Sequence, residues 1–151
     1  MLLQYQKLDQ AACSPQTGYA ADLGIDLCTP AAFTLPARGN YVVDTGLRIK
    51  IPAVPEALRA DFQLGCFIWA KSGLSVKSNI EKGAGVVDPG YTGPLRIKLY
   101  NHGGTDVPFA AGDKIAQMVF MLCAKIDAVV ETDLDHHQTE RGERGFGSSG
   151  R

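Results

Sequence analysis

Val86-Val-Asp-Pro-Gly-Tyr-Thr-Gly-Pro-Leu-Arg-Ile-Lys-Leu99 is the stretch of sequence that says most about the fold. Two β-branched residues precede the turn residues Asp88-Pro-Gly90, and the segment 95–99 then alternates strictly between apolar and basic side chains. Strict alternation is typical of a half-buried strand, because successive side chains point to opposite faces of a sheet. The stretch therefore predicts two strands joined by a hairpin turn.

The rest of the chain repeats this pattern of short strands separated by Gly, Pro and Asp. Residues 47–51 alternate in the same way, and residues 41–43 and 129–130 are β-branched pieces beside turn residues. The segments 62–70 and 114–122 are more continuously apolar, as in strands that are covered on both faces. Helical signals are few, and short helical turns are expected only at 55–61 and 72–78. The pattern predicts an all-β jelly roll or barrel.

Length and composition fit one globular domain. The chain has 151 residues, of which 45% are hydrophobic and 21% charged. We expect a single domain over 1–151, with a β-barrel core at 1–131. The hydrophobic signal fades from about Asp127, and the polar segment that follows leads into a Gly-rich end. Residues 132–151 are therefore predicted to form a C-terminal arm.

Charge and cysteine usage exclude several classes of function. The chain has fifteen basic and sixteen acidic residues, so it has no excess of positive charge to bind nucleic acid. An anionic ligand would have to be bound by a few specifically placed cations. The chain contains no Cys-x-x-Cys pair, so a zinc site built on paired cysteines is not expected. Four cysteines could form two disulfides. Neither a secretory leader nor a long apolar run is present. We expect a reduced, soluble, intracellular protein without nucleic-acid or membrane partners.

Five separated segments look specialised. A Gly-rich run such as the last one can fold its backbone N–H groups around phosphate oxygens. Each segment alone also has a purely structural explanation: a capped turn, a hairpin turn, a strand entry, or a frayed Gly/Ser-rich tail. The segments are Asp22-Leu-Gly-Ile-Asp-Leu-Cys-Thr-Pro30, Lys71-Ser-Gly-Leu-Ser75, Gly83-Ala-Gly-Val-Val-Asp-Pro-Gly-Tyr-Thr-Gly-Pro94, Gly112-Asp-Lys-Ile-Ala-Gln117 and Arg141-Gly-Glu-Arg-Gly-Phe-Gly-Ser-Ser-Gly-Arg151.

In this order and spacing, the five segments resemble the five motifs of the trimeric dUTP pyrophosphatase (dUTPase) family. The resemblance runs from Asp22 to Gly150, and the third and fifth segments are its most specific parts. It implies an all-β subunit with a distorted jelly-roll or β-barrel fold and a flexible C-terminal arm. It also implies a homotrimer in which each active site draws motifs from all three subunits.

The resemblance implies a reaction, the hydrolysis of dUTP to dUMP and pyrophosphate, which keeps uracil out of DNA and supplies dUMP for thymidylate synthesis. Asp88 holds the place of the carboxylate that activates the water attacking the α-phosphorus. Mg²⁺ is implied as a bridge between the phosphates, with Asp26 acting on it through water only. The residues implied in phosphate binding are Lys71, Ser72, Gly73, Gln117, Arg141, Gly147, Ser148 and Ser149.

The same resemblance implies how the base and sugar are selected. The main chain of the third segment would bind the uracil edge and reject cytosine, whose donors and acceptors are exchanged. Tyr91 would pack under the deoxyribose and exclude a 2′-hydroxyl. Phe146 would stack on the uracil when the arm closes. The main-chain contacts are implied at Gly85, Val86, Val87 and Arg96.

Three positions depart from the family pattern. Lys71 stands where Arg is usual, which keeps the charge but loses the bidentate fork. Lys114 stands where Arg is common, and Leu23 replaces a small residue. The segment 52–64 is also longer than the family leads us to expect, and its part 53–61 is either a partner-binding insertion or tolerated surface.

Two other functions were weighed against dUTP hydrolysis. The dCTP deaminases resemble this family in fold, but the position of their catalytic Glu aligns with Lys98, which cannot act as that carboxylate. A non-catalytic or additional regulatory role on the dUTPase fold remains the alternative, because the insertion offers a surface for it.

Overall fold

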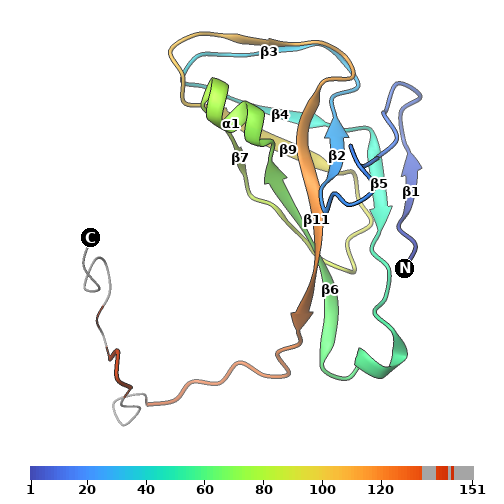
Figure 1. The fold of residues 1–151 in the computed structure, drawn as a ribbon, viewed down its shortest axis with the longest axis vertical. Coiled ribbons are helices and arrows are strands. Elements are labelled where there is room, and N and C mark those ends of the chain that lie inside the picture. The colour runs from blue at the N-terminus through green and yellow to red at the C-terminus, as the bar shows by residue number, and fades with distance from the viewer. Residues whose placement is uncertain (134–138, 143, 145–151) are drawn as a thin grey trace.

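The structure is a computed structural model of the chain, and it describes residues 1–133, 139–142 and 144. Strands dominate these residues, with one short α-helix and one 3-10 helix, so the all-β prediction is confirmed (Figure 1). The elements are β1 (Gln4–Lys7), β2 (Ile25–Cys28), β3 (Phe33–Leu35), β4 (Asn40–Asp44), β5 (Leu47–Lys50), η1 (Glu56–Leu58), β6 (Phe62–Ala70), α1 (Ser72–Ser78), β7 (Ile80–Gly83), β8 (Val86–Val87), β9 (Arg96–Asn101), β10 (Val107–Phe109) and β11 (Lys114–Ala124).

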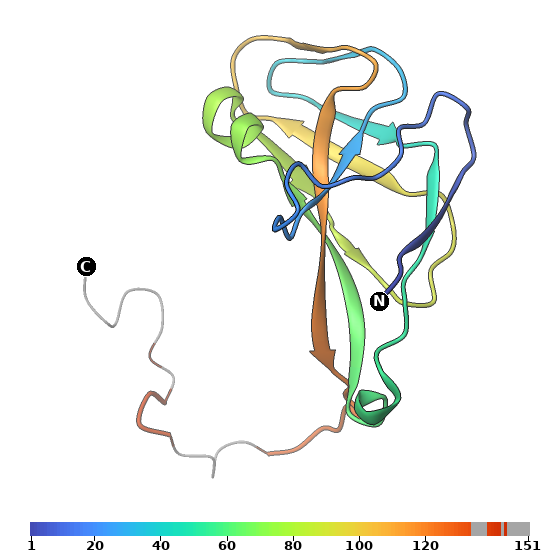
Figure 2. The same ribbon diagram turned by 45° about the vertical axis from the view of Figure 1, so that its right-hand side comes forward.

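The strands pair antiparallel in small sheets that curl around one core (Figure 2). The largest sheet has the order β2-β11-β6-β8, and a second has the order β4-β9-β7. The predicted hairpin across Asp88-Pro-Gly90 is therefore wrong, because β8 and β9 lie in different sheets and β9 pairs with β7 instead. Two-stranded pairs β1-β5 and β10-β3 complete the barrel. Strands distant in sequence are neighbours in every sheet, which is the connectivity of a jelly roll.

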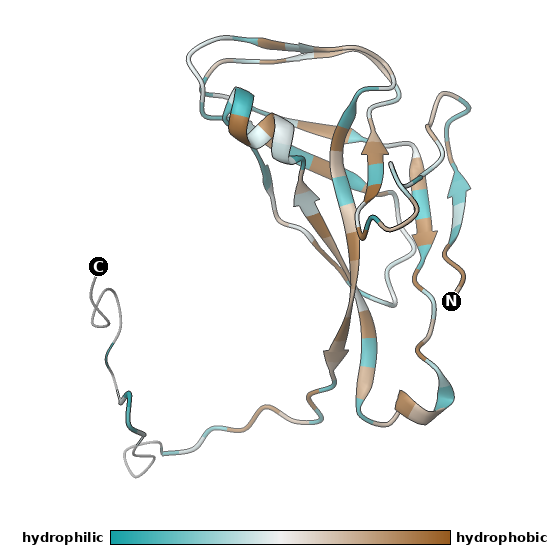
Figure 3. Cartoon of the chain, in the orientation of Figure 1, coloured by the Kyte–Doolittle hydropathy of each residue, from teal (hydrophilic) through white to brown (hydrophobic). Residues whose placement is uncertain are grey.

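The alternation seen in the sequence becomes the inside and outside of the barrel. Leu47 and Ile49 of β5 are buried, whereas Arg48 and Lys50 between them are exposed. In β9, Ile97 and Leu99 are buried in the same way. Figure 3 shows this alternation as bands of opposite hydropathy along the strands. The predicted turn at 72–78 is the helix α1, which ends where Asn79 adopts a left-handed conformation with φ of 51°.

Two expectations about the apolar strands need correction. The strands β6 and β11 were expected to be covered on both faces, but Trp69 is 52% exposed and Met121 is 38% exposed. Within one chain, therefore, only the inner face of this pair is covered. The strand expected at 129–130 is wrong, because β11 ends at Ala124 and Val129 is 95% exposed. Figure 1 shows the described residues after β11 running away from the barrel.

The longer segment between β5 and β6 folds against the end of the barrel that carries the start of the C-terminal segment. Its 3-10 helix is followed by Arg59, whose Nε donates to the Val54 carbonyl at 3.1 Å. The Lys125 amide donates to the Asp61 carbonyl at 2.8 Å, which ties this segment to the end of β11. None of the helices in the described part of the chain has the length and apolar character needed to cross a membrane.

Candidate active site

Asp26 joins three of the specialised segments. It lies on β2 and is only 4% exposed. Its Oδ1 accepts a hydrogen bond from Lys71 Nζ at 2.5 Å, and its Oδ2 lies 2.6 Å from Lys114 Nζ. The carboxylate therefore holds two cations, one from the segment after β6 and one from the start of β11. Both ammonium groups keep contact with solvent, because the Lys71 side chain is 28% exposed and that of Lys114 is 51% exposed.

The charges of this cluster support one another. Burial opposes ionisation of Asp26, but the hydrogen bonds from Lys114 and Lys71 outweigh it, so the pKa of Asp26 lies below its ordinary value. The hydrogen bond to Asp26 raises the pKa of Lys114. At neutral pH the cluster thus holds two ammonium groups around one carboxylate. That arrangement has a net positive charge and suits an anionic ligand.

Gln117 lies beside this cluster for reasons of strand register. It pairs with Asp26 on one side and with Trp69 on the other, so the three side chains share one face of the sheet. Its Nε2 donates to the Ala70 carbonyl at 3.1 Å. Gly24 gives the Gln117 side chain room, since a Cβ at residue 24 would lie 2.0 Å from Gln117 Oε1.

Ser72 and Gly73 form the first turn of α1, immediately after Lys71. The amides of a first helical turn have no acceptor within their own helix. Both residues are exposed, and a Cβ at Gly73 would meet no atom within 4 Å. Packing within the chain therefore does not require glycine at residue 73, and the space in front of it is open to a ligand or to another chain.

The third segment builds a separate cavity of about 240 Å³. A turn in which the Tyr91 amide donates to the Asp88 carbonyl at 2.9 Å closes one side of it. The Tyr91 hydroxyl donates to the Pro94 carbonyl at 2.8 Å, which holds the ring over the turn. The residues that line the cavity are Ile68, Gly83, Ala84, Gly85, Val86, Val87, Asp88, Tyr91, Pro94, Leu95, Arg96 and Ile97.

Gly85 fits its place in this cavity wall for two reasons. Its φ is +139°, and a Cβ there would lie 2.9 Å from the Ile68 carbonyl oxygen. The Ile68 amide also donates to the Gly85 carbonyl at 2.7 Å, which fixes the backbone of residue 85 against β6. The predicted base-binding main chain at 85–87 and at Arg96 therefore lines one cavity. The Arg96 side chain reaches out of it to Asp44, at 3.3 Å.

The cavity and the Asp26 cluster occupy different parts of the chain. From β2 to β8 the sheet takes three interstrand steps, or roughly 14 Å. Val87 of β8 pairs with Cys66 of β6, whereas Asp26 lies level with Trp69 of β6, further along that strand. Asp88 is therefore also displaced from Asp26 by about 13 Å along the strand direction. Asp88 and Asp26 are thus on the order of 20 Å apart in one flat sheet. One chain brings the first, second and fourth segments together and keeps Asp88 of the third segment apart from them.

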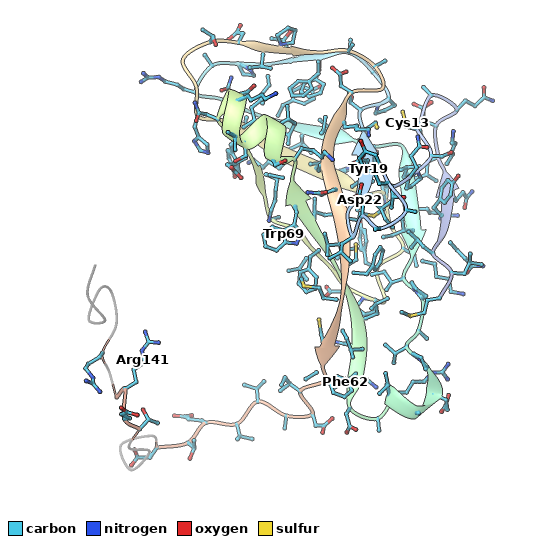
Figure 4. The ribbon with its side chains drawn as sticks, in the orientation of Figure 1. Cys13, Tyr19, Asp22, Phe62, Trp69 and Arg141 are labelled. Carbon is cyan, nitrogen blue, oxygen red and sulfur yellow. The ribbon has the colours of Figure 1, made fainter. Side chains whose placement is uncertain are left out.

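Only Arg141, Gly142 and Arg144 of the fifth segment are among the described residues. Arg141 lies on the segment that has left the barrel, far from Trp69 and Asp22 (Figure 4). Its Nε donates to the Arg144 carbonyl at 2.9 Å. The predicted ligands Phe146, Gly147, Ser148 and Ser149 lie outside the described residues.

Two residues near the cluster were not singled out as ligands from the sequence. The sequence marks Lys114 only as a departure from the usual Arg, yet its ammonium group forms an ion pair with Asp26 Oδ2. Trp69, the only tryptophan of the chain, lies next to Gln117 and points outward from β6 (Figure 4). Sequence periodicity gave no signal for either role, because strand pairing between β2, β11 and β6 creates both neighbourhoods.

The described residues include no group of three or more His, Cys, Asp or Glu side chains placed to hold a metal ion. Asp26 has lysine ammonium groups on both oxygens, although each oxygen retains a lone pair for a water molecule. These residues fit a cation that is carried by phosphates and reached through water, and they do not form a protein cage.

Comparison with known proteins places the chain. The dUTPase family model matches residues 10–150. A deoxyuridine 5'-triphosphate nucleotidohydrolase of Oryza sativa subsp. japonica is 40% identical over 149 residues, which cover 99% of this chain and 81% of that protein. The solved structure of the Staphylococcus bacteriophage 80alpha dUTPase with dUPNHPP matches with a TM-score of 0.81 at 23% identity, covering 99% of both chains.

A further structure of the same fold is a dUTPase from phage phi11 of S. aureus, described with a structural Mg(II) ion. It matches with a TM-score of 0.71 at 19% identity and covers 91% of this chain and 100% of that chain. At such identities the two phage structures establish the fold. The class that follows is a hydrolase built on an all-β barrel. More particularly, the chain belongs to the dUTPase family, as the motifs predicted.

Proposed function

We propose that this protein hydrolyses dUTP to dUMP and pyrophosphate, and that it does so as a homotrimer. The observation that carries the proposal is the division of the site. Cationic and amide groups suited to phosphates gather around Asp26, whereas Asp88, at the cavity of the third segment, lies about 20 Å from Asp26 along the sheet. The general base must lie within hydrogen-bond reach of a water beside the phosphates, so we infer that Asp88 and the Asp26 cluster of one site come from different copies of the chain.

The open face of β6 and β11 supports the same assembly. Trp69 and Met121 are exposed on strands whose composition is that of buried strands. A second and a third copy packed on this face would cover them and bring another copy's third segment toward the Asp26 cluster. In this assembly the arm at 132–151 extends from the barrel core and closes a site on a neighbouring copy.

In the complete site, Asp88 accepts a proton from the water that attacks the α-phosphorus. A carboxylate within hydrogen-bond reach of that water serves as general base. The leaving pyrophosphate is held by Lys71, by the Ser72 and Gly73 amides and by Gln117. Arg141, Gly147, Ser148 and Ser149 close over the outer phosphates, and Phe146 stacks on the base. Displacement at phosphorus depends mainly on such positioning and charge stabilisation.

Base and sugar selection belong to the third segment. Main-chain groups around Gly85, Val86, Val87 and Arg96 pair with the uracil edge, and fixed backbone donors and acceptors reject cytosine. Tyr91 lies against the deoxyribose, where its ring leaves no space for a 2′-hydroxyl. The cavity of about 240 Å³ has room for a pyrimidine base.

Mg²⁺ is the cofactor that this chemistry requires. Bound to the phosphates, it neutralises their charge during the displacement. Asp26 would hold that ion through water, and its two lysine partners would add positive charge beside the phosphates. In the cell, the reaction removes dUTP before uracil enters DNA and supplies dUMP for thymidylate synthesis.

The test measures pyrophosphate release with Mg²⁺ from dUTP, dCTP, dTTP and UTP, for the wild type and for Asp88→Asn. We expect turnover of dUTP alone and a loss of roughly 10²–10⁴-fold in kcat in the variant, with nucleotide binding retained. Asp61→Asn is the matched control, since Asp61 is an exposed carboxylate at the far end of β6. If dUTP binds without turnover in the wild type, the protein has a regulatory role instead. Ammonia release from dCTP would identify a deaminase.

Sedimentation and dUTP turnover, both measured at decreasing protein concentration, test the trimer. The activity per chain should fall as the trimer dissociates, because no single copy holds a complete site. A monomer with full activity contradicts the assembly, whatever its substrate.

A further inference from the structure

Cys13 and Cys28 are two free thiols that meet although fourteen residues separate them. Cys28 is the last residue of β2, and Cys13 lies on the segment that runs back along that strand (Figure 4). The Cys13 thiol lies near enough to add to the effect of burial, which raises the pKa of Cys28 to about 11.

Backbone pairing holds the two segments together. Gln16 forms an antiparallel bridge with Asp26, and the Asp26 amide donates to the Gln16 carbonyl at 2.9 Å. This bridge places the residues before Gln16 next to the residues after Asp26. The proximity of the two cysteines therefore follows from local chain pairing.

The other cysteines lack such a neighbour. Cys66 is fully buried in the core, with 0% exposure. Cys123 lies on β11 near the far end of the barrel, where its Sγ is 3.5 Å from the Met121 carbonyl. Cys13 and Cys28 are both partly exposed, so a small oxidant reaches them from solvent.

We propose that Cys13 and Cys28 form an oxidation site, at which a two-electron oxidant such as hydrogen peroxide converts the thiol pair into an intrachain disulfide. The first thiol is oxidised to a sulfenic acid, and the peroxide is reduced to water. The sulfur of the second thiol then attacks the sulfenic sulfur, the S–S bond forms and the S–O bond breaks. The hydroxyl leaves with the proton of the second thiol as another water molecule. The balance is two thiols and one peroxide to one disulfide and two waters.

The consequence is a covalent tie across the segment that leads into Asp26. The bond would fix the loop between Cys13 and β2, including Asp22 and Gly24, without occupying the space around Gln117. A disulfide closing a loop of this length stabilises a fold mainly by restricting the unfolded chain. We therefore expect oxidation to raise the Tm by several degrees.

Trypsin makes the site easy to read. The chain has no Lys or Arg between Lys7 and Arg38, so both thiols fall in one peptide, 8–38. Cys66 and Cys123 fall in separate peptides, 60–71 and 115–125. The folded, full-length protein is treated with one equivalent of hydrogen peroxide, alkylated, denatured and digested. Alkylation before and after reduction then counts the thiols in each peptide by mass.

We expect peptide 8–38 to lose two hydrogen masses and both alkylation sites together, whereas peptide 115–125, with one thiol, forms no internal disulfide. Reduction should restore both sites. In Cys13→Ser, peptide 8–38 should no longer lose two hydrogen masses, whereas Cys123→Ser should change nothing in peptide 8–38.

The inference is overturned if peptide 8–38 keeps both alkylation sites while peptide 115–125 is oxidised, or if cross-links join different chains instead. Circular dichroism of Cys13→Ser and Cys28→Ser confirms that each variant is folded before it is compared. Neither thiol takes part in the proposed hydrolysis, so the outcome is independent of whether dUTP is the substrate.

Discussion

Lys71 Nζ donates to Asp26 Oδ1 at 2.5 Å, and this contact joins the first and second motifs across the sheet. Lys71 follows directly on β6 and Asp26 lies in β2, with β11 between them. The intervening strand supplies Lys114 on the second carboxylate oxygen and Gln117 beside it. One buried carboxylate thus sets the positions of both lysine ammonium groups.

Asp26→Asn should destabilise the protein by about 2 kcal/mol at pH 7. Removing one partner of a buried pair leaves uncompensated charge, and the cost is moderate here because both lysines keep contact with water. Urea unfolding of both proteins measures the difference. Asp44→Asn, which breaks the exposed pair with Arg96, is the matched control and should cost less than about 1 kcal/mol.

The same pair predicts a pH dependence. The folded-state pKa of Asp26 lies below its ordinary 3.8, so the stabilisation by ionised Asp26 is fully present above that value. It is lost as the pH falls through the lower, folded-state pKa. The difference in unfolding free energy between wild type and Asp26→Asn should therefore be constant from about pH 7 to pH 5 and shrink below about pH 3.8. A difference that grows toward acid would contradict this assignment.

Gly24→Ala should raise KM for dUTP as Gln117→Ala does, although Gln117 itself is not replaced. A Cβ at residue 24 would lie 2.0 Å from Gln117 Oε1, so that side chain must move away. Because the obstacle is a flexible side chain, stability should change little. Loss of one hydrogen bond to a charged phosphate raises KM for dUTP roughly 10- to 100-fold.

Three comparisons test this displacement. The double variant should be no worse than either single one, since both remove the same contact. Gly18→Ala, in the same segment, would place a Cβ 3.0 Å from the Asp22 carboxylate only and should leave KM unchanged. Additive effects of Gly24→Ala and Gln117→Ala would mean that Gly24 acts on something else.

Gly73→Ala should separate ligand binding from folding. No atom lies within 4 Å of the Cβ position, and alanine is the better helix former by about 0.5–1 kcal/mol. We expect an unchanged or slightly higher Tm but a kcat/KM for dUTP reduced at least ten-fold, because phosphate oxygens approach this backbone closely. Gly104→Ala, equally free of neighbours but in the loop after β9, is the control and should leave both quantities unchanged. Wild-type kinetics for Gly73→Ala would place the phosphates elsewhere.

Tyr91→Ala should relax discrimination against the ribose. Removing the ring opens space beside the cavity, so the ratio of kcat/KM for UTP to that for dUTP should rise roughly ten-fold or more. Tyr91→Phe keeps the ring and loses only the hydrogen bond to the Pro94 carbonyl, and its selectivity should match the wild type. Competition between the two nucleotides in one assay gives the ratio directly. Equal selectivity in all three proteins would remove Tyr91 from sugar recognition.

The sequence by itself determined the local structure and the family. Alternation at 47–51 and 95–99 predicted β5 and β9, because the period of two in a strand is a local property of the backbone. The turn at Asp88-Pro-Gly90 and the short helix at 72–78 also follow from residues close in sequence. The predicted hairpin does not form, because β8 pairs with β6 and β9 pairs with β4 and β7. The motif order identified the family without any knowledge of contacts. The strand expected at 129–130 failed, because β-branched residues form strands only where a partner strand pairs with them.

Tertiary structure decided which of the motif residues meet. Only the register of β2, β11 and β6 places Asp26, Gln117 and Trp69 in one row, and only this row brings Lys114 to Asp26. The separation of Asp88 from that cluster likewise appears only when the strand order β2-β11-β6-β8 is known. Such pairings join residues far apart in the chain, and hydrophobic periodicity records which face a side chain occupies but not which strand lies beside it.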